Sequence, residues 1–138
     1  MPTIFTKIIN REVPAHIVYE DEHVIAFLDI APLAKGHTVL IPKVEVPTLD
    51  RLDDEHAAAI GRALPRVSRA VVEATGCPDF NVLQNNGKPA HQEVMHLHFH
   101  IIPKPSESEG LGVGWPAGSL DQEAAGDLAE RIKAGLPD

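Results

Sequence analysis

Three histidines alternate with apolar residues in segment 94–102, and this alternation constrains the fold more than any other part of the chain. Successive side chains of a β-strand point to opposite faces, so the pattern predicts a strand with His96, His98 and His100 on one face and apolar residues on the other. Each imidazole has two nitrogens that need hydrogen-bond partners when water is excluded. A row of three histidines is therefore more typical of a functional site than of a purely structural strand.

Two kinds of chemistry fit this row of histidines. With a rise of ~3.3 Å per residue, the α-carbons of neighbouring histidines lie about 6.6 Å apart, so one metal ion would take two of the three and need further ligands from elsewhere. Alternatively, the middle histidine acts as a nucleophile or a general base, while its neighbours orient it and hold an anion. The spacing alone leaves both alternatives open.

The composition bounds the class of protein. A chain of 138 residues that is 43% hydrophobic is long enough for a single domain, residues 1–138, with a substantial core. Its formal net charge of −8 argues against a nucleic-acid partner or an acidic membrane surface, because both need a basic surface. The lone Cys77 cannot form an internal disulfide, and no apolar run approaches ~20 residues, so we expect a cytoplasmic protein.

Short strands and helices are predicted along the rest of the chain. Apolar residues at helical spacing predict a short helix within residues 1–10 and a long helix over about 53–75, kinked or split at Pro65. A loose tail is expected from about residue 103, with a small helix over 120–133. Strands are predicted over 17–19, 24–28, 38–41, 80–83 and 94–102.

The connections between these strands are mostly hairpin-like. They predict an α+β fold, with an antiparallel sheet, helices grouped on one face and the histidine strand in the interior of the sheet.

A loop rich in amides and glycine, residues 85–92, lies directly before the histidines. Asparagine and glutamine amides are neutral donors, and glycine permits close approach of the backbone, so this loop could cradle a phosphate. Asn-Gly is also a common turn dipeptide. The position of the loop next to three histidines favours the phosphate interpretation.

The motif Asn85-x-Gly87-x4-Gln92, followed by the three alternating histidines, resembles the signature of the histidine triad (HIT) family. It is closest to the nucleotide-binding, hydrolase-like branch, and shorter matches such as 26–32 and 40–43 stand in the same order and spacing. The resemblance covers most of the chain. It implies a HIT-like antiparallel sheet of about five strands, with a long helix and a short N-terminal helix, in a homodimer.

The resemblance implies covalent chemistry at the α-phosphate of a nucleotide. In such proteins the middle histidine attacks phosphorus and forms a nucleotidyl-histidine, which water then hydrolyses; here that residue is His98. His100 would hold a phosphate oxygen, while His96 and His37 would support the histidine network. We expect no cofactor and no metal in this protein.

The remaining implied contacts are with the substrate. Asn85 and Gln92 match the phosphate or leaving-group contacts, and Asp29 matches the acid that binds the ribose hydroxyls. Apolar residues, which could equally be core, match a pocket around the base: Ile4, Phe5, Ile8, Phe27, Ile30 and Val39.

The implied substrate is a purine nucleotide in the form of an AMP conjugate. AMP phosphoramidates are the first expectation and dinucleoside polyphosphates the second. A purine-nucleotide sensor or scaffold with negligible turnover is the alternative, since phosphate contacts and a pocket suffice for binding.

Five positions depart from the pattern of relatives. Some bacterial relatives have a structural zinc site made by two cysteines in the first helix and a later histidine, where this chain has Thr3, Thr6 and Glu45. Hydroxyls are poor zinc ligands, so the departure predicts a zinc-free variant. His91 stands where many relatives have glycine and Glu93 where some have serine, and the sequence leaves the roles of both open.

Overall fold

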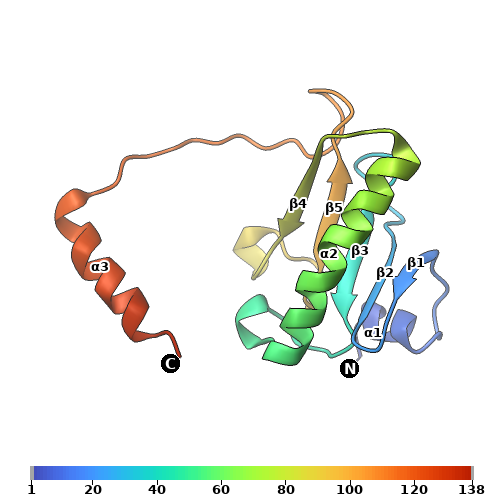
Figure 1. Cartoon of the computed structure of the whole chain (residues 1–138), viewed down its shortest axis with the longest axis horizontal. Helices are drawn as coiled ribbons and strands as arrows, with labels where there is room; N and C mark the ends of the chain where they lie inside the picture. The colour runs from blue at the N-terminus through green and yellow to red at the C-terminus, as the bar shows by residue number, and fades with distance from the viewer. Residues whose placement is uncertain (1, 138) are drawn as a thin grey trace.

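The computed structural model describes residues 2–137, and its centre is a five-stranded antiparallel sheet (Figure 1). The sheet has the order β1-β2-β3-β5-β4, so β5, which carries His100, is an interior strand as the sequence predicted. The α+β prediction is confirmed. The strands are β1 (Ile17–Glu20), β2 (Val24–Leu28), β3 (Thr38–Pro42), β4 (Phe80–Gln84) and β5 (Phe99–Pro103).

Only the C-terminal part of the predicted histidine strand is a strand. β5 begins at Phe99, and residues 94–98 before it have no strand pairing. The neighbouring β3 ends at Pro42, which has no N–H to donate to a ladder. The backbone N–H of Leu97 instead donates to the carbonyl of Val46, beyond the end of β3, at 2.8 Å. The predicted strand over 94–102 is therefore too long at its N-terminal end.

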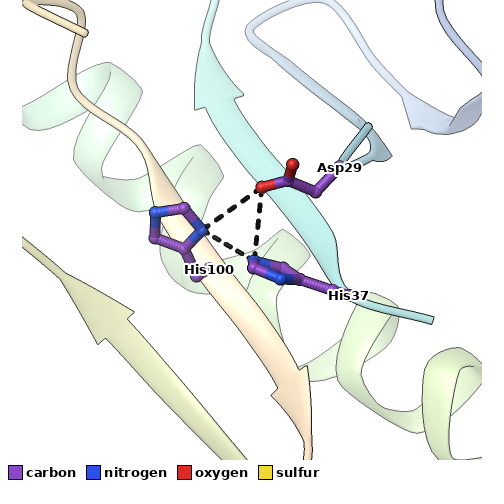
Figure 2. Close-up of side chains that lie close together, drawn as sticks. All are labelled: Asp29, His37 and His100. Atoms are coloured by element: carbon purple, nitrogen blue, oxygen red, sulfur yellow. Dashed lines mark hydrogen bonds and ion pairs between the residues drawn. The ribbon is translucent and has the colours of Figure 1, made fainter. Parts of the chain in front are cut away.

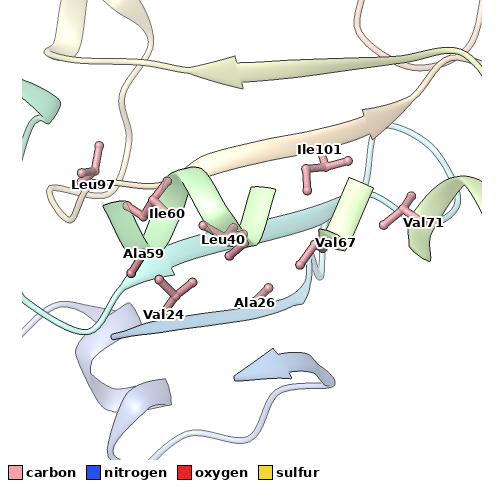
Figure 3. Close-up of a cluster of buried hydrophobic side chains, with 10 residues drawn as sticks. Val24, Ala26, Leu40, Ala59, Ile60, Val67, Val71, Leu97 and Ile101 are labelled. Carbon is pink, nitrogen blue, oxygen red and sulfur yellow. The ribbon is translucent and has the colours of Figure 1, made fainter. Parts of the chain in front are cut away.

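The long helix α2 (Asp54–Thr75) covers one face of the sheet (Figure 3). The side chain of Asp53 caps it by accepting from the backbone N–H of His56 at 3.1 Å, and Gly76 ends it in the left-handed conformation at φ 69°. Its apolar face and the facing strands form the main core. That core contains Val24, Ala26, Leu40, Ala59, Ile60, Ala63, Val67, Val71, Leu97 and Ile101.

α2 runs without interruption through Pro65, where the sequence predicted a kink or a split. The proline ring removes the helical donor for the carbonyl of Gly61. Both residues lie on the exposed face, so water can replace the missing bond. Ala63 and Val67 on either side are buried against the sheet and hold the helix in one piece.

The short helix α1 (Ile4–Ile9) packs on the opposite face of the sheet, so the prediction that the helices share one face is wrong. Its burial requires a second apolar surface, which β2 and β3 supply because nearly all of their residues are buried. Apolar runs without polar alternation are typical of strands covered on both faces. The second core contains Ile8, Ile25, Phe27, Val39 and Ile41.

The chain leaves the sheet after β5 and ends in α3 (Gln122–Ala134), which lies away from the rest of the molecule in Figure 1. Asp121 caps this helix by accepting from the backbone N–H of Glu123 at 3.1 Å. Its apolar side chains are exposed, as at Ile132. Within residues 2–137, no helix is both long enough and apolar enough to cross a membrane.

Candidate active site

A cavity of about 400 Å³ lies between α1, the end of β2 and the histidine segment. His98 and His100 line it, together with Asp29 at the end of β2. The structure thus brings the proposed nucleophile, the proposed ribose ligand and every proposed base-pocket residue to one cavity. The lining residues from the proposed base pocket are Ile4, Phe5, Ile8, Phe27, Ile30 and Val39.

Phe5 of α1 joins the apolar part of the cavity to the histidines. Its ring centre lies 5.6 Å from that of Phe27 and 5.0 Å from that of His98, both in edge-to-face geometry. α1 therefore forms an aromatic wall directly beside the middle histidine.

His98 has a fixed tautomer. Its Nδ1 lies 2.7 Å from the carbonyl oxygen of His96, and a carbonyl only accepts, so Nδ1 carries the proton. In the neutral ring the lone pair is then on Nε2. Burial lowers the pKa of His98, and the carbonyl of His96 and the charges of Asp29 and Glu93 only partly offset this effect. His98 is consequently neutral near pH 7, with an unprotonated nitrogen in a residue that lines the cavity.

A second hydrogen-bonded chain fixes the orientation of His100 (Figure 2). The backbone N–H of Leu33 donates to Nδ1 of His37 at 3.0 Å, so the proton of the neutral His37 ring is on Nε2. Nε2 of His37 lies 2.9 Å from Nδ1 of His100 and 3.5 Å from Asp29 Oδ2. His100 accepts a hydrogen bond from His37 at its Nδ1, so its own proton is on Nε2, which is free to donate.

Burial makes the histidines of the site hard to protonate. It lowers the pKa of His37 and of His96, and it lowers the pKa of His100 to about 4, with further contributions from His98 and His37. The site therefore consists of neutral imidazoles with defined donors and acceptors.

Asp29, His37 and His100 also have potential ligand atoms within 4.8 Å of one another, the arrangement required by the metal interpretation of the histidines. Their hydrogen bonds argue against that use. A ring nitrogen that carries a proton has no lone pair for a metal. Nε2 of His37 carries the proton, because Nδ1 accepts a hydrogen bond from the backbone N–H of Leu33. The geometry fits a chain of hydrogen bonds better than a metal centre.

His96 lies behind the cavity and is fully buried. Its Nε2 lies 3.0 Å from the carbonyl oxygen of Pro42 and must donate, so its Nδ1 accepts from the Thr3 hydroxyl, also at 3.0 Å. The same hydroxyl caps α1 by accepting from the backbone N–H of Thr6 at 3.1 Å. His96 thus joins the start of α1 to the end of β3.

Glu45 completes this connection. Its Oε1 accepts from the backbone N–H of Thr3 at 2.9 Å and from the Thr6 hydroxyl at 2.7 Å, and these bonds hold the pKa of the carboxyl below its usual value. We call Thr3, Thr6, Glu45 and His96 the α1 clamp. The sequence identified the first three as replacements for zinc ligands but did not predict that they bond to one another.

The loop before the histidines is held by Gln92, which is buried. Its side-chain oxygen accepts from the backbone N–H of Gly87 at 2.7 Å, and its nitrogen donates to the carbonyls of Pro47 at 2.6 Å and Val94 at 3.0 Å. Gln92 does not line the cavity, and its side-chain bonds shape the loop. Asn85, at the end of β4, does not line the cavity either.

Three consecutive residues from the α1–β1 connection also line the cavity, and sequence reasoning missed them: Val13, Pro14 and Ala15. They form an apolar stretch too short to show any periodicity. His91 and Glu93, whose roles the sequence left open, line the cavity as well. His91 adopts φ 69°, a left-handed conformation that few residues other than glycine favour.

The model of the HIT domain family matches residues 10–107, more than half of the chain. This chain belongs to the HIT domain family. The adenosine 5'-monophosphoramidase of Schizosaccharomyces pombe is 47% identical to it over 134 residues, which span 97% of this chain and 98% of that protein. The protein of the same name from Saccharomyces cerevisiae is 44% identical, over 96% of this chain and 82% of its own.

Solved structures agree with the family assignment. The crystal structure of a HIT family member from Bacillus subtilis has a TM-score of 0.94 to this HIT protein at 37% identity, and the match covers 100% of this chain and 99% of that one. The expected HIT-like sheet, with one long helix and a short helix at the N-terminus, is therefore confirmed.

Acidification is expected to destabilise this HIT protein. The folded-state pKa values of its site histidines lie below the ordinary value of about 6.5, so below that pH the unfolded chain binds more protons. The free energy of unfolding should fall as the pH drops from about 6.5 towards about 4, with about 2 kcal/mol from His100 after allowance for its partial exposure. Urea unfolding across this range measures the change. His100→Asn should show a smaller loss, and an equal loss would contradict the assignment.

The α1 clamp predicts a local effect of Glu45. α1 has six residues, too few for a helix that is stable by itself. Glu45→Ala should therefore speed amide hydrogen exchange in residues 6–10 roughly tenfold and leave α2 unchanged. Glu45→Gln keeps the accepting oxygen and should restore most of the protection. Unchanged exchange of α1 in Glu45→Ala would show that the clamp does not hold the helix.

Proposed function

We propose that this HIT protein hydrolyses AMP conjugates through a nucleotidyl-histidine intermediate on His98. The observation that carries the proposal is the 2.7 Å bond from Nδ1 of His98 to the carbonyl of His96, which leaves Nε2 unprotonated in a residue that lines the cavity. Relatives named adenosine 5'-monophosphoramidase match nearly the whole chain and support AMP phosphoramidates as the substrate class. Dinucleoside polyphosphates are the second class.

The reaction has two displacements at phosphorus. Nε2 of His98 attacks the α-phosphorus, the bond from phosphorus to the leaving-group nitrogen breaks, and that nitrogen takes a proton from water and leaves as the neutral amine. A second water then attacks the same phosphorus and gives up a proton to solvent, the bond to His98 breaks, and AMP is released with the neutral ring restored. The carbonyl of His96 stabilises the positive charge that develops on the ring, because Nδ1–H already donates to it.

The neighbouring side chains have binding roles in this proposal. His100 donates through Nε2–H to a non-bridging phosphate oxygen, where negative charge increases in the transition state. Asp29 accepts from the ribose hydroxyls; its Oδ1 already accepts from the backbone N–H of Ala31 at 2.8 Å, which fixes the carboxylate. The apolar wall with Phe5 and Phe27 contacts the base.

The decisive experiment removes the attacking nitrogen. His98→Asn should bind AMP within roughly threefold of wild type but lose several orders of magnitude in kcat, because covalent catalysis needs the ring. Rapid alkaline quench of wild type with an AMP phosphoramidate should trap a phosphorus–nitrogen adduct, and subsequent acid treatment should hydrolyse it. His56→Asn, a change at a histidine that bonds to Asp53 on the surface, is the matched control.

If His98→Asn turned over substrate at the wild-type rate, and no adduct were trapped in wild type, the covalent mechanism would be refuted. Binding of AMP without turnover of any conjugate by wild type would favour the alternative, a purine-nucleotide sensor or scaffold.

The proposal extends to a homodimer of the single domain. β4 is an edge strand, and beside it α2 and β4 border an apolar groove of about 640 Å³. Phe80 and Val82 are 39% and 48% exposed there. Arg69 and Glu73 line the same groove, so two copies related by a twofold axis could pair opposite charges. Unpaired strand edges and apolar patches of this kind favour association.

Val82→Asp should convert the dimer to a monomer, because it places a charge in the proposed interface without disturbing the buried core. Sedimentation equilibrium would measure the mass. Val18→Asp is the matched control, since Val18 is 51% exposed on β1, the edge strand at the other side of the sheet. A mass unchanged by Val82→Asp, or reduced equally by Val18→Asp, would refute this interface.

A further inference from the structure

The cavity has an unusual charge for a site that is to bind phosphate. Among the described residues that line it, none is a lysine or an arginine, whereas two, Asp29 and Glu93, carry carboxylates. Phosphate sites usually draw on cationic side chains. Here the donors are neutral imidazoles, because burial lowers the pKa of both His98 and His100. The formal charge of the described lining side chains is therefore negative before any substrate binds.

The two carboxylates have different positions. Asp29 follows β2 and is already bonded to the backbone of Ala31, next to His37. Glu93 lies in the segment that leads to the histidines, and the proposed function leaves it without a role. It is close enough to His98 for its charge to oppose the lowering of the pKa of that ring.

Glu93 is presented by a rigid piece of backbone. Gln92, directly before it, exchanges two bonds with Gly87, from Gly87 N–H to the Gln92 side chain at 2.7 Å and from Gln92 N–H to the Gly87 carbonyl at 3.1 Å. The Gln92 side chain also donates to the carbonyl of Val94, directly after Glu93, at 3.0 Å. Bonds on both sides thus fix the point from which the exposed carboxylate enters the cavity wall.

We propose that Glu93 forms a leaving-group subsite for positively charged amines, so that the preferred substrates are AMP phosphoramidates of cationic amines. This inference rests on the proposed function and narrows its substrate class. A leaving amine with a distal ammonium group gains an attractive interaction with Glu93. A polyphosphate leaving group places several negative charges near Glu93, and the chain as a whole has a net charge of −8, so repulsion disfavours it.

Three AMP phosphoramidates test the subsite, with leaving amines of equal chain length that end in ammonium, hydroxyl or carboxylate. In wild type, kcat/KM should decrease in that order, with roughly tenfold or more between the first and the last. Added salt should reduce this ratio, because the subsite is open to solvent.

Glu93→Gln keeps the shape of the side chain and removes its charge. The ratio of kcat/KM between the ammonium and carboxylate substrates should fall to within roughly threefold of unity and lose its salt dependence. Glu22→Gln is the matched control: it removes the same charge from the β1–β2 turn, outside the cavity lining, and should keep the wild-type ratio.

The binding of the same conjugates to His98→Asn, measured by calorimetry, separates this inference from the proposed function. An affinity order that follows the charge of the leaving amine and depends on Glu93 supports the subsite, whether or not wild type turns the conjugates over. Absence of turnover by wild type would refute only the proposed function. Equal kcat/KM values for the three conjugates in wild type would overturn the subsite and leave the proposed function intact. So would a charge preference that survives Glu93→Gln.

Discussion

The site depends on the hydrogen bond from Nδ1 of His98 to the backbone carbonyl of His96. In a regular sheet that carbonyl would be bonded to a neighbouring strand. Here residues 94–98 are outside the ladder, because β3 ends at Pro42 and the chain after it supplies a different partner, Val46, to Leu97. A local loss of strand pairing is thus what makes the carbonyl available to fix the tautomer of a side chain.

Burial on both faces of the sheet gives this arrangement its rigidity. α2 packs against one face of the sheet. There it shares a core with Leu97 and Ile101, which alternate with the histidines along the chain. α1 packs against the other face and contributes Phe5 to the cavity wall. The alternation therefore places a core on one side of the segment and neutral imidazoles on the other, and low solvent access keeps those imidazoles unprotonated.

Sequence patterns predicted the parts of the fold that depend on local chemistry. The long helix over about 53–75 and the alternation around His98 both follow from spacing rules that act over a few residues. The family resemblance supplied the expected pocket residues, which the structure gathers around one cavity.

Features that depend on distant contacts could not be predicted in this way. The face covered by α1 depends on a second core between strands. The buried amide of Gln92 bonds to Pro47, 45 positions earlier in the chain. Glu45 and His96 both bond to Thr3, at the start of α1, and no spacing in the sequence indicates these contacts.

The α1 clamp has a consequence for the resistance of the site to oxidation. Its members are hydroxyls, a carboxylate and an imidazole, none of which peroxide converts to a sulfenic acid or a disulfide. The single cysteine, Cys77, lies just after α2, where its thiol donates to the carbonyl of Asp79 at 3.2 Å, and it does not line the cavity. The helix that closes the pocket is thus held by groups whose chemistry is the same under reducing and oxidising conditions.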